Sequence, residues 1–551
     1  MDMNVILPSE RIAAMTLAGH WHDRTVIDYL DAAAAAHPDK VALTDWNSMS
    51  EQASTFSFRQ LKKLSERIGA GLYALGMRKG DVISYQLPNW WQFVALHLGA
   101  ARIGCVTNPL MPIFRHRELV HMLGLAESKV LVVPQRFRGF DYPAMVAGIS
   151  DGLPALEHVL VIGGEAEVSF EAFMARRWED ELDAQRLFAA QRQGSNEVTQ
   201  ILYTSGTTGE SKGVMHTANT MFGNLVEFAR RLQMSERDSV FMASPLAHQT
   251  GFLYGILLPI MLQATIVLHD VWSAEAAALR IEEERCTFTM ASTPFLADLA
   301  DLTTLARHDL SSLRIFLCGG APIPEALARR AAERLRCAIM SAWGMTENGA
   351  VTTTQPGDPD DKVFGTDGCA LPGSELRVID AAGTRCPPGI EGELQVRGAS
   401  IFVGYLKRPH LYGVDAEGWF DTGDRARMDS EGYIRITGRS KDVILRGGEN
   451  IPVVEVESLL YRHPAISEVA VVAMPDPRLG ERACAFVTLK PGAPRLALGD
   501  IASFLSEQRM AKQYFPERLE ILEDMPRTPS GKIQKFKLRE AAKLLRPDGS
   551  A

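Results

Sequence analysis

The residues best suited to chemistry lie in a loop that follows the apolar run ending at Leu202. The loop reads YTSGTTGESKGV and combines small hydroxyl side chains with glycines and a lysine. Glycines let successive backbone N–H groups point into one concavity, which is a common way to bind an anion. The hydroxyl groups add donors, and the lysine adds positive charge. The residues predicted to bind a polyphosphate are Thr204, Ser205, Gly206, Thr207, Thr208, Gly209 and Lys212.

Two alternatives for this loop are a solvated Gly/Ser/Thr turn and the phosphate loop of a P-loop ATPase. The density of hydroxyl groups and the lysine favour phosphate over the plain turn. The P-loop pattern is G-x-x-x-x-G-K-[ST]. Counted from Gly206, Ser211 stands at its sixth position and Gly213 follows the lysine, so the hydroxyl that would bind Mg²⁺ is missing. The sequence therefore indicates a different kind of phosphate loop.

Bulk composition excludes several classes of protein. A chain of 551 residues is longer than one core accommodates, so two or more domains are expected. The net charge of −9 gives no overall basic field for nucleic acid or anionic lipid. The seven cysteines form no CxxC pair, which indicates neither a zinc site nor a disulfide framework and favours a cytoplasmic protein. No secretory leader is expected at the N-terminus.

The longest apolar run covers residues 252–268 and contains Pro259, Gln263 and Thr265. It is shorter than the roughly 20 residues that span a bilayer. We predict a buried helix that continues into a buried strand, with a membrane span as the alternative.

Apolar strand patterns alternate with helical patterns along the first two thirds of the chain, which predicts an α/β fold with largely parallel sheets. The clearest strand patterns are at 129–134, 158–164, 264–270, 287–292 and 314–320. From Ser374 onwards, short alternating strands predict an antiparallel, β-barrel-like piece. After Gly438, about 110 residues form a block of the size of a small α+β domain. The predicted division is a domain at 1–437, a hinge at 438–441 and a mobile domain at 442–551.

The loop is accompanied by seven further motifs in a fixed order. They are PLAHQTG (245–251), CGGAP (318–322), WGMTE (343–347), GELQVRG (392–398), GWFDTGD (418–424), GRSKDVILRGGENI (438–451) and RTPSGKIQK (527–535). Together they resemble the signature of the AMP-forming acyl-CoA synthetases, the acyl-adenylate-forming ANL superfamily. The N-terminal stretch is most similar to cyclohexanecarboxylate-CoA ligases and medium-chain acyl-CoA synthetases.

The resemblance implies the ANL fold and an acid–thiol ligase that uses ATP, Mg²⁺ and coenzyme A. In such enzymes a carboxylate attacks the α-phosphate of ATP and releases pyrophosphate, and a thiol then attacks the acyl carbon and expels AMP. By resemblance, Glu347 associates with Mg²⁺ and Thr346 contacts phosphate. Lys532 bridges the carboxylate and the α-phosphate, because one ammonium cancels the repulsion between two anions.

The resemblance also assigns the remaining nucleotide contacts. Trp343 stands where the family usually has a tyrosine that stacks on adenine, so any bond from that tyrosine's hydroxyl is missing here. Asp424 and Arg439 match the ribose contacts. The other residues placed at the nucleotide are Gly320, Ala321, Pro322, Gly344 and Met345.

The acyl pocket is expected to include His248 as a gate, with Phe252 and Gly319 on its lining. Lys441 matches the hinge about which the small domain rotates. Arg446, Gly447 and Gly448 match the path of coenzyme A. Before the last strand the chain departs from the family, because Tyr514 replaces the lysine of a Tyr-Lys-x-Pro run. The contact from that lysine to the phosphates of coenzyme A is therefore missing here.

The expected lining is apolar, so an apolar short- or medium-chain, alicyclic or aromatic carboxylic acid is the predicted substrate. Nineteen residues follow Lys532, which leaves no room for a carrier domain and favours free coenzyme A as the acceptor. Three alternatives stay open: a stand-alone adenylation enzyme that loads a separate carrier, a luciferase-like mono-oxygenase, and a non-catalytic nucleotide-binding regulator. A homodimer is also left open, and neither nucleic acid nor a membrane span is expected among the partners.

Overall fold

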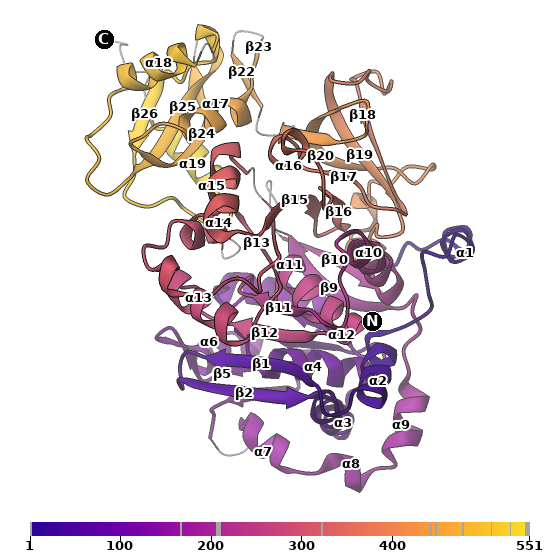
Figure 1. Ribbon diagram of the computed structural model, residues 1–551. Coiled ribbons are helices and arrows are strands. Elements are labelled where there is room, and N and C mark those ends of the chain that lie inside the picture. The colour runs from indigo at the N-terminus through magenta and orange to yellow at the C-terminus, as the bar shows by residue number, and fades with distance from the viewer. Residues whose placement is uncertain are drawn as a thin grey trace.

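The computed structural model describes residues 3–165, 168–204, 211–320, 323–439, 443–446, 449–476, 479–508, 510–528 and 531–545. Figure 1 shows a large N-terminal body, coloured from indigo to orange, and a smaller C-terminal lobe in yellow. Among the described residues, no helix combines the length and the apolar character that crossing a membrane requires.

A six-stranded sheet carries the strands on either side of the glycine loop. Its strands, in spatial order, are β10 (Lys212–Thr217), β9 (Val198–Thr204), β4 (Val106–Pro109), β3 (Val82–Tyr85), β5 (Val130–Pro134) and β8 (His158–Ile162). All neighbouring pairs are parallel except β9 and β10. Strands such as β5, VLVVP, are buried along their whole length, as expected for a sheet that is covered on both faces.

A nine-stranded sheet forms the other half of the α/β core. Its strands, in spatial order, are β17 (Cys369–Ala370), β16 (Gly349–Thr353), β15 (Ala338–Met345), β14 (Ile315–Gly319), β13 (Phe288–Ala291), β11 (Ser239–Met242), β12 (Thr265–His269), β1 (Val41–Asn47) and β2 (Gln52–Ser57). The strands from β15 to β1 run parallel, and antiparallel strands close both edges.

Helices surround these sheets. They are α1 (Ser9–Leu17), α2 (Val26–Ala36), α3 (Phe58–Ala74), α4 (Trp91–Arg102), α5 (His116–Ala126), α6 (Tyr142–Ala147), α7 (Phe170–Ala175), α8 (Trp178–Glu181), α9 (Ala184–Gln191), α10 (Ala218–Arg231), α11 (Gln249–Phe252), α12 (Leu258–Leu262), α13 (Ala274–Glu283), α14 (Thr293–Ala300), α15 (Glu325–Leu335) and α16 (Asp360–Gly365). Helix α1 is the exception, because it has no buried residue and projects to one side of the body (Figure 1). Helix α10 begins directly after β10, where Thr217 accepts a bond from the N–H of Thr220 and so caps the helix.

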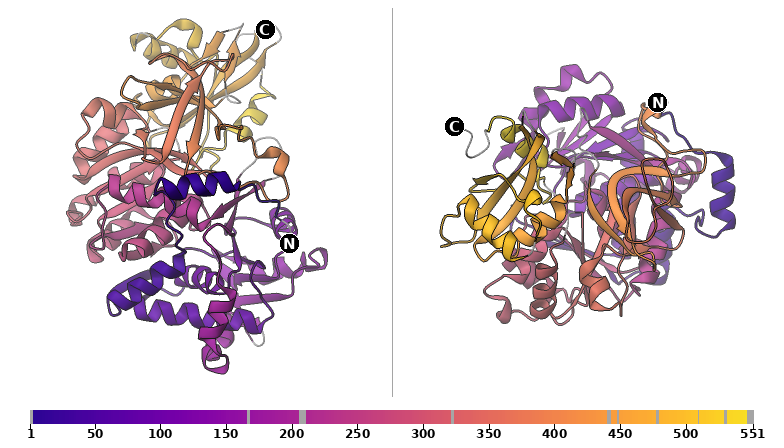
Figure 2. Two further views of the ribbon diagram at one scale, coloured as in Figure 1. Left: turned by 90° about the vertical axis from the view of Figure 1, so that its right-hand side faces the viewer. Right: turned by 90° about the horizontal axis from the view of Figure 1, so that it is seen from above.

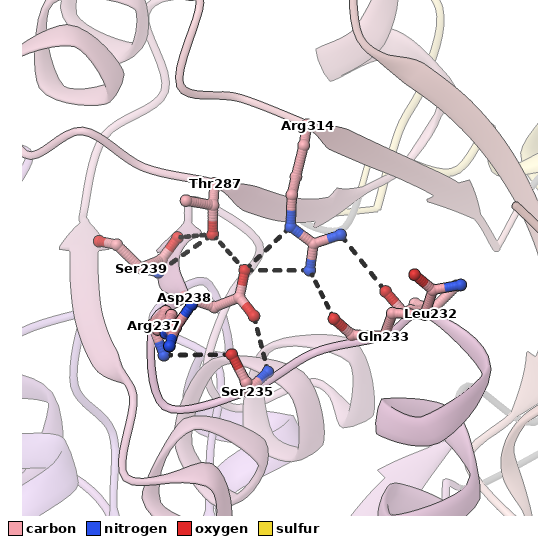
Figure 3. Close-up of polar contacts among 8 residues, drawn as sticks. All are labelled: Leu232, Gln233, Ser235, Arg237, Asp238, Ser239, Thr287 and Arg314. Carbon is pink, nitrogen blue, oxygen red and sulfur yellow. Dashed lines mark hydrogen bonds and ion pairs between the residues drawn. The ribbon is translucent and has the colours of Figure 1, made fainter.

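A buried carboxylate, Asp238, ties neighbouring strands together at their amino ends (Figure 3). Its Oδ1 accepts from Thr287 Oγ1 at 2.6 Å and from Arg314 Nε at 3.1 Å, and its Oδ2 accepts from the Ser235 N–H at 2.8 Å. Strands β11, β13 and β14 begin directly after Asp238, Thr287 and Arg314. The network holds three strands in register, and their opposite, carboxyl ends form the edge at which α/β proteins bind ligands.

The predicted barrel-like piece is an antiparallel sheet of four strands in the order β18 (Ser374–Ile379), β19 (Glu391–Gly398), β20 (Phe420–Met428) and β21 (Ile434–Arg439). The described strands form an open path from β18 to β21, so the piece is not a closed barrel. Alternating burial along β19 explains the alternating sequence pattern.

The C-terminal lobe contains a five-stranded sheet and three helices. Its elements are β22 (Ile444–Arg446), β23 (Glu449–Ile451), α17 (Val453–Leu460), β24 (Ile466–Asp476), β25 (Gly480–Leu489), α18 (Leu498–Glu507), β26 (Arg518–Ile521) and α19 (Lys535–Ala542). Both views of Figure 2 show the lobe lying against the N-terminal body. Tyr461, at the end of α17, packs against the cluster of buried residues that includes Leu327 of α15.

The predicted α/β class and its largely parallel sheets are confirmed. The apolar run at 252–268 is also confirmed as helix followed by strand, because α11 continues through a π-helical turn (Leu253–Leu257) into α12 and then β12. The large N-terminal and small C-terminal parts match the expected ANL fold.

Candidate active site

Strands β9 and β10 present the two described ends of the glycine loop side by side. Thr204 and Lys212 are paired across this ladder. Thr204 Oγ1 is buried and has no hydrogen-bond partner among the described residues. The Lys212 ammonium lies 4.1 Å from the ring centroid of Tyr405. A hydroxyl and a cation thus stand together where the sequence predicts phosphate.

Glu347 lies in the turn between β15 and β16 and is held by the segment around residue 402. Its Oε1 accepts from the Tyr405 hydroxyl at 2.7 Å, and its carbonyl accepts from the Phe402 N–H at 2.8 Å. The residue is 4% exposed. Burial, together with the nearby Glu347 carboxylate, raises the pKa of Tyr405 well above its ordinary value, so the phenol stays a donor.

The carbonyl of Thr346 accepts from His216, a residue of β10. Nε2 of this histidine lies 2.7 Å from the carbonyl oxygen, and Nδ1 lies 3.0 Å from Thr220 Oγ1. Burial lowers the pKa of His216 to about 4, so the ring is neutral at physiological pH. The strand that leaves the glycine loop is therefore joined to the turn that carries Glu347.

Trp343, Asp424 and Arg439 form one connected group. The indole Nε1 of Trp343 donates to Asp424 Oδ2 at 2.9 Å, and Arg439 Nε donates to Asp424 Oδ1 at 3.0 Å. Asp424 is 5% exposed, so its charge is compensated mainly by these donors. The indole therefore supplies a hydrogen-bond donor of its own at the position where the family usually has a tyrosine.

The donors around Glu347 fit a magnesium ion that is shared with a nucleotide, and they do not fit an ion held by protein alone. No group of three or more His, Cys, Asp or Glu side chains able to hold a metal occurs among the described residues. Mg²⁺ commonly takes one or two carboxylates and completes its shell with phosphate oxygens and water. Glu347 supplies one carboxylate, and the unpartnered Thr204 hydroxyl supplies a donor for phosphate.

The expected acyl-pocket residues lie at the carboxyl edge of the nine-stranded sheet. His248 precedes α11, and its Nδ1 accepts from the Thr250 N–H at 3.3 Å. Phe252 is fully buried, with its ring 4.7 Å from that of His97. Gly319 ends β14, where an added Cβ would lie 2.9 Å from the carbonyl oxygen of Ala342.

Burial of the imidazole, together with the positive charge of Lys532, lowers the pKa of His248 to about 4, so Lys532 is within electrostatic range of this ring. The preceding residue, Gly531, is seated on the start of α14: an added Cβ would lie 2.7 Å from Ser292 Oγ and 3.4 Å from the ring of Phe295. The lysine loop of the C-terminal lobe therefore reaches the N-terminal body at the expected acyl gate.

Two of the motifs, WGMTE and CGGAP, contain a glycine that no other residue could replace without a clash or backbone strain. A Cβ on Gly344 would lie 1.9 Å from the carbonyl oxygen of Gly349, and Gly320 has a φ of +82°. Met345 donates its N–H to Asn348 Oδ1 at 3.0 Å and so closes the turn before Glu347.

Arg446 forms a bidentate pair with Glu517 at 3.0 and 2.8 Å, and both residues belong to the C-terminal lobe. Ten predicted site residues lie outside the described residues: Ser205, Gly206, Thr207, Thr208, Gly209, Ala321, Pro322, Lys441, Gly447 and Gly448.

Tyr405 and His216 contact this site, but the sequence analysis did not select them. The signal for His216 is an imidazole inside KGVMHT, a strand that is buried after its first residue. Tyr405 follows Gly404, whose φ of +128° marks a special backbone position, but nothing local points to Glu347 as its partner.

Family comparisons agree with this geometry. The model described as AMP-binding enzyme matches residues 30–406, and the one described as AMP-binding enzyme C-terminal domain matches residues 455–532. The chain is 37% identical over 542 residues to the medium-chain fatty-acid–CoA ligase of Escherichia coli strain K12, covering 98% of this chain and 94% of that protein. It is 31% identical to the 2,3-dihydroxybenzoate-AMP ligase of Bacillus subtilis strain 168, covering 97% and 96%.

Among solved structures, the anthranilate CoA ligase AuaEII in complex with anthranoyl-AMP is similar, with a TM-score of 0.85 and 27% identity over 95% of this chain and 98% of that chain. The fold, both family models and the named relatives agree. The chain belongs to the family of AMP-binding enzymes, as an adenylate-forming ligase of the acyl-CoA synthetase type in the ANL superfamily.

Proposed function

We propose that this enzyme joins an apolar carboxylic acid to coenzyme A through an acyl adenylate, with release of pyrophosphate and AMP. The observation that supports the proposal is that Gly531 of the C-terminal lobe packs against the start of α14, with the charge of the next residue, Lys532, acting on the buried His248. An ammonium at this position meets the acid at the point where its carboxylate approaches the nucleotide.

In the first half-reaction an anion must approach a polyanion, so positive charge and donors dominate the energetics. The proposed phosphate contacts are Thr204, Lys212, Thr346 and the glycine loop. A magnesium ion at Glu347 would neutralise charge on the phosphate oxygens. The carboxylate of Asp424 is held by Trp343 and Arg439 and would accept bonds from the ribose hydroxyls.

For the second half-reaction we propose that the segment 442–551 rotates about Lys441 and withdraws Lys532. Arg446, Gly447 and Gly448 would then line the path of coenzyme A. In the present arrangement Arg446 forms an ion pair with Glu517. The proposed rotation would bring Arg446 to coenzyme A, where it would leave this ion pair.

The proposed acid is a short- or medium-chain, alicyclic or aromatic monocarboxylate, with cyclohexanecarboxylate among the first to test. The fully buried Phe252 and the glycines at the end of β14 support an apolar pocket, in which an unpaired second charge would be costly. The name of the Escherichia coli relative supports a medium chain.

A pyrophosphate-release assay with a panel of such acids, followed by detection of the acyl-CoA, tests the reaction. Lys532→Ala should lower adenylate formation far more than thioester formation from supplied acyl-AMP, because the ammonium acts only where the two anions meet. Release of no pyrophosphate with any acid would refute the reaction. Equal losses in both half-reactions would refute the role of Lys532.

A second candidate is an adenylation enzyme that transfers its acyl group to a separate carrier protein. It is favoured by the relative named 2,3-dihydroxybenzoate-AMP ligase, whose name mentions no coenzyme A. Acyl adenylate that forms at the normal rate but does not react with coenzyme A would favour this candidate over the first.

A further inference from the structure

An imidazole is an unusual side chain for the middle of a buried strand. His216 lies on β10 between Met215 and Thr217 and is 1% exposed. Side chains alternate between the faces of a strand, so His216 points to the same face as Lys212, four residues earlier. It therefore shares a face with the lysine that follows the glycine loop.

The two ring nitrogens have distinct partners. A carbonyl oxygen can only accept, so Nε2 carries the hydrogen in the 2.7 Å bond to Thr346. Nδ1 of the neutral ring then lies 3.0 Å from Thr220 Oγ1, whose one hydrogen it shares with the carbonyl oxygen of Thr217, also at 3.0 Å. Thr220 belongs to the first turn of α10, which Thr217 caps. The ring is thus fixed by the helix on one side and bonded to the turn on the other.

The turn that receives this bond precedes the carboxylate proposed for magnesium. Met345 and Glu347 are held from other directions, by Asn348 Oδ1 and by the N–H of Phe402. Tyr405 fixes the side chain of Glu347. His216 adds a bond from the strand that leaves the phosphate loop, and so sets the position of the turn relative to that loop.

We propose that His216 is a positioning residue that holds the Thr346–Glu347 turn against β10, so that Glu347 and the phosphate loop engage the same magnesium–nucleotide complex. This inference rests on the proposed function of the site. It assigns His216 no contact with substrate and no proton transfer. Its expected effect is on affinity for the metal in the presence of nucleotide, because outer partners of metal ligands typically change affinity by about 10- to 100-fold.

The test uses His216→Leu, which removes the donor, and His216→Gln, whose amide N–H can replace Nε2. His216→Asn keeps a buried polar side chain but is too short to span the same gap, and it serves if the leucine variant does not fold. The matched control is His158→Leu, which loses a bond of the same kind, from Nε2 to the carbonyl of Leu75 at 2.9 Å, far from the site.

Binding of Mn²⁺ is measured by electron paramagnetic resonance on the full chain with a non-hydrolysable ATP analogue, and binding of the analogue alone by calorimetry in EDTA. We expect His216→Leu, or His216→Asn in its place, to weaken Mn²⁺ binding by about 10- to 100-fold. Binding of the analogue without metal should fall much less, because Thr346 is only one of several proposed phosphate contacts. His216→Gln should restore most of the metal affinity, and His158→Leu should match the wild type.

Unchanged Mn²⁺ affinity in the leucine or asparagine variant would overturn the inference. So would a parallel loss of metal and metal-free nucleotide binding, or an equal loss in His158→Leu, because either would indicate general damage. A wild-type protein that binds no Mn²⁺–nucleotide complex at all would instead contradict the proposed function.

Discussion

At the scale of single residues, the most informative departure from the family pattern is Trp343. Its indole N–H donates to a buried carboxylate, Asp424, whose other oxygen accepts from Arg439. The tryptophan therefore has two separable properties, a flat ring that can stack on a base and a donor that orients the proposed ribose contact. Phenylalanine keeps the first property and lacks the second.

Trp343→Phe should raise the KM for ATP by about 10- to 100-fold, since a hydrogen bond to a charged group contributes about 1.5–3 kcal/mol. It should also reduce discrimination between ATP and 2′-deoxy-ATP, while kcat falls less. Steady-state pyrophosphate release with both nucleotides measures this. Trp178→Phe is the control, because it removes an indole bond from the remote helix α8 to the carbonyl of Phe173 on α7. An unchanged KM and preference in Trp343→Phe would show that the bond does not orient Asp424.

At the scale of elements, strands were predictable from the sequence because a strand that is buried on both faces appears as a short run of apolar residues. The patterns at 129–134 and 314–320 correspond to β5 and β14. The contacts between elements produce no such local pattern in the sequence. His216 lies 130 residues from Thr346, and Tyr405 lies 58 residues from Glu347. A local pattern cannot reveal partners at such separations, so the resemblance supplied the site residues and the fold supplied their supports.

The turn between β15 and β16 gives a prediction at this scale. A Cβ on Gly344 would lie 1.9 Å from the carbonyl oxygen of Gly349, a backbone atom of the paired strand β16 that cannot move aside as a side chain could. Gly344→Ala should therefore destabilise the protein by about 1–3 kcal/mol or more and weaken binding of nucleotide. Urea unfolding followed by tryptophan fluorescence measures the first effect. Gly365→Ala, where an added Cβ would meet nothing within 4 Å, should be nearly neutral. Equal midpoints for the two variants would contradict the steric account.

At the scale of the whole molecule, the proposed role of Lys532 in adenylate formation requires the C-terminal lobe to contact the N-terminal body. Gly531 packs against the start of α14, the charge of Lys532 acts on His248, and Tyr461 packs against the buried cluster that includes Leu327 of α15. Meanwhile Arg446, the proposed contact for coenzyme A, is paired within the lobe. If the lobe must leave this seat between half-reactions, a change at the seat should affect the two halves unequally.

Gly531→Ala tests the seat. The new Cβ would lie 2.7 Å from Ser292 Oγ, and at a φ of +82° any side chain is strained. Gly492→Ala, also in the C-terminal lobe, imposes the same strain at a φ of +76° but meets nothing within 4 Å. Comparing the two variants therefore separates the effect of docking the lysine loop from the effect of backbone strain.

We expect Gly531→Ala to slow pyrophosphate release about tenfold or more relative to Gly492→Ala. An outward shift of the loop moves Lys532 from its position, and small misplacements are costly in catalysis. Thioester formation from supplied acyl-AMP should be similar in both variants. Equal rates of pyrophosphate release in the two variants would mean that the contact with α14 does not position Lys532, and the proposed role of Lys532 in adenylate formation would lose its structural support.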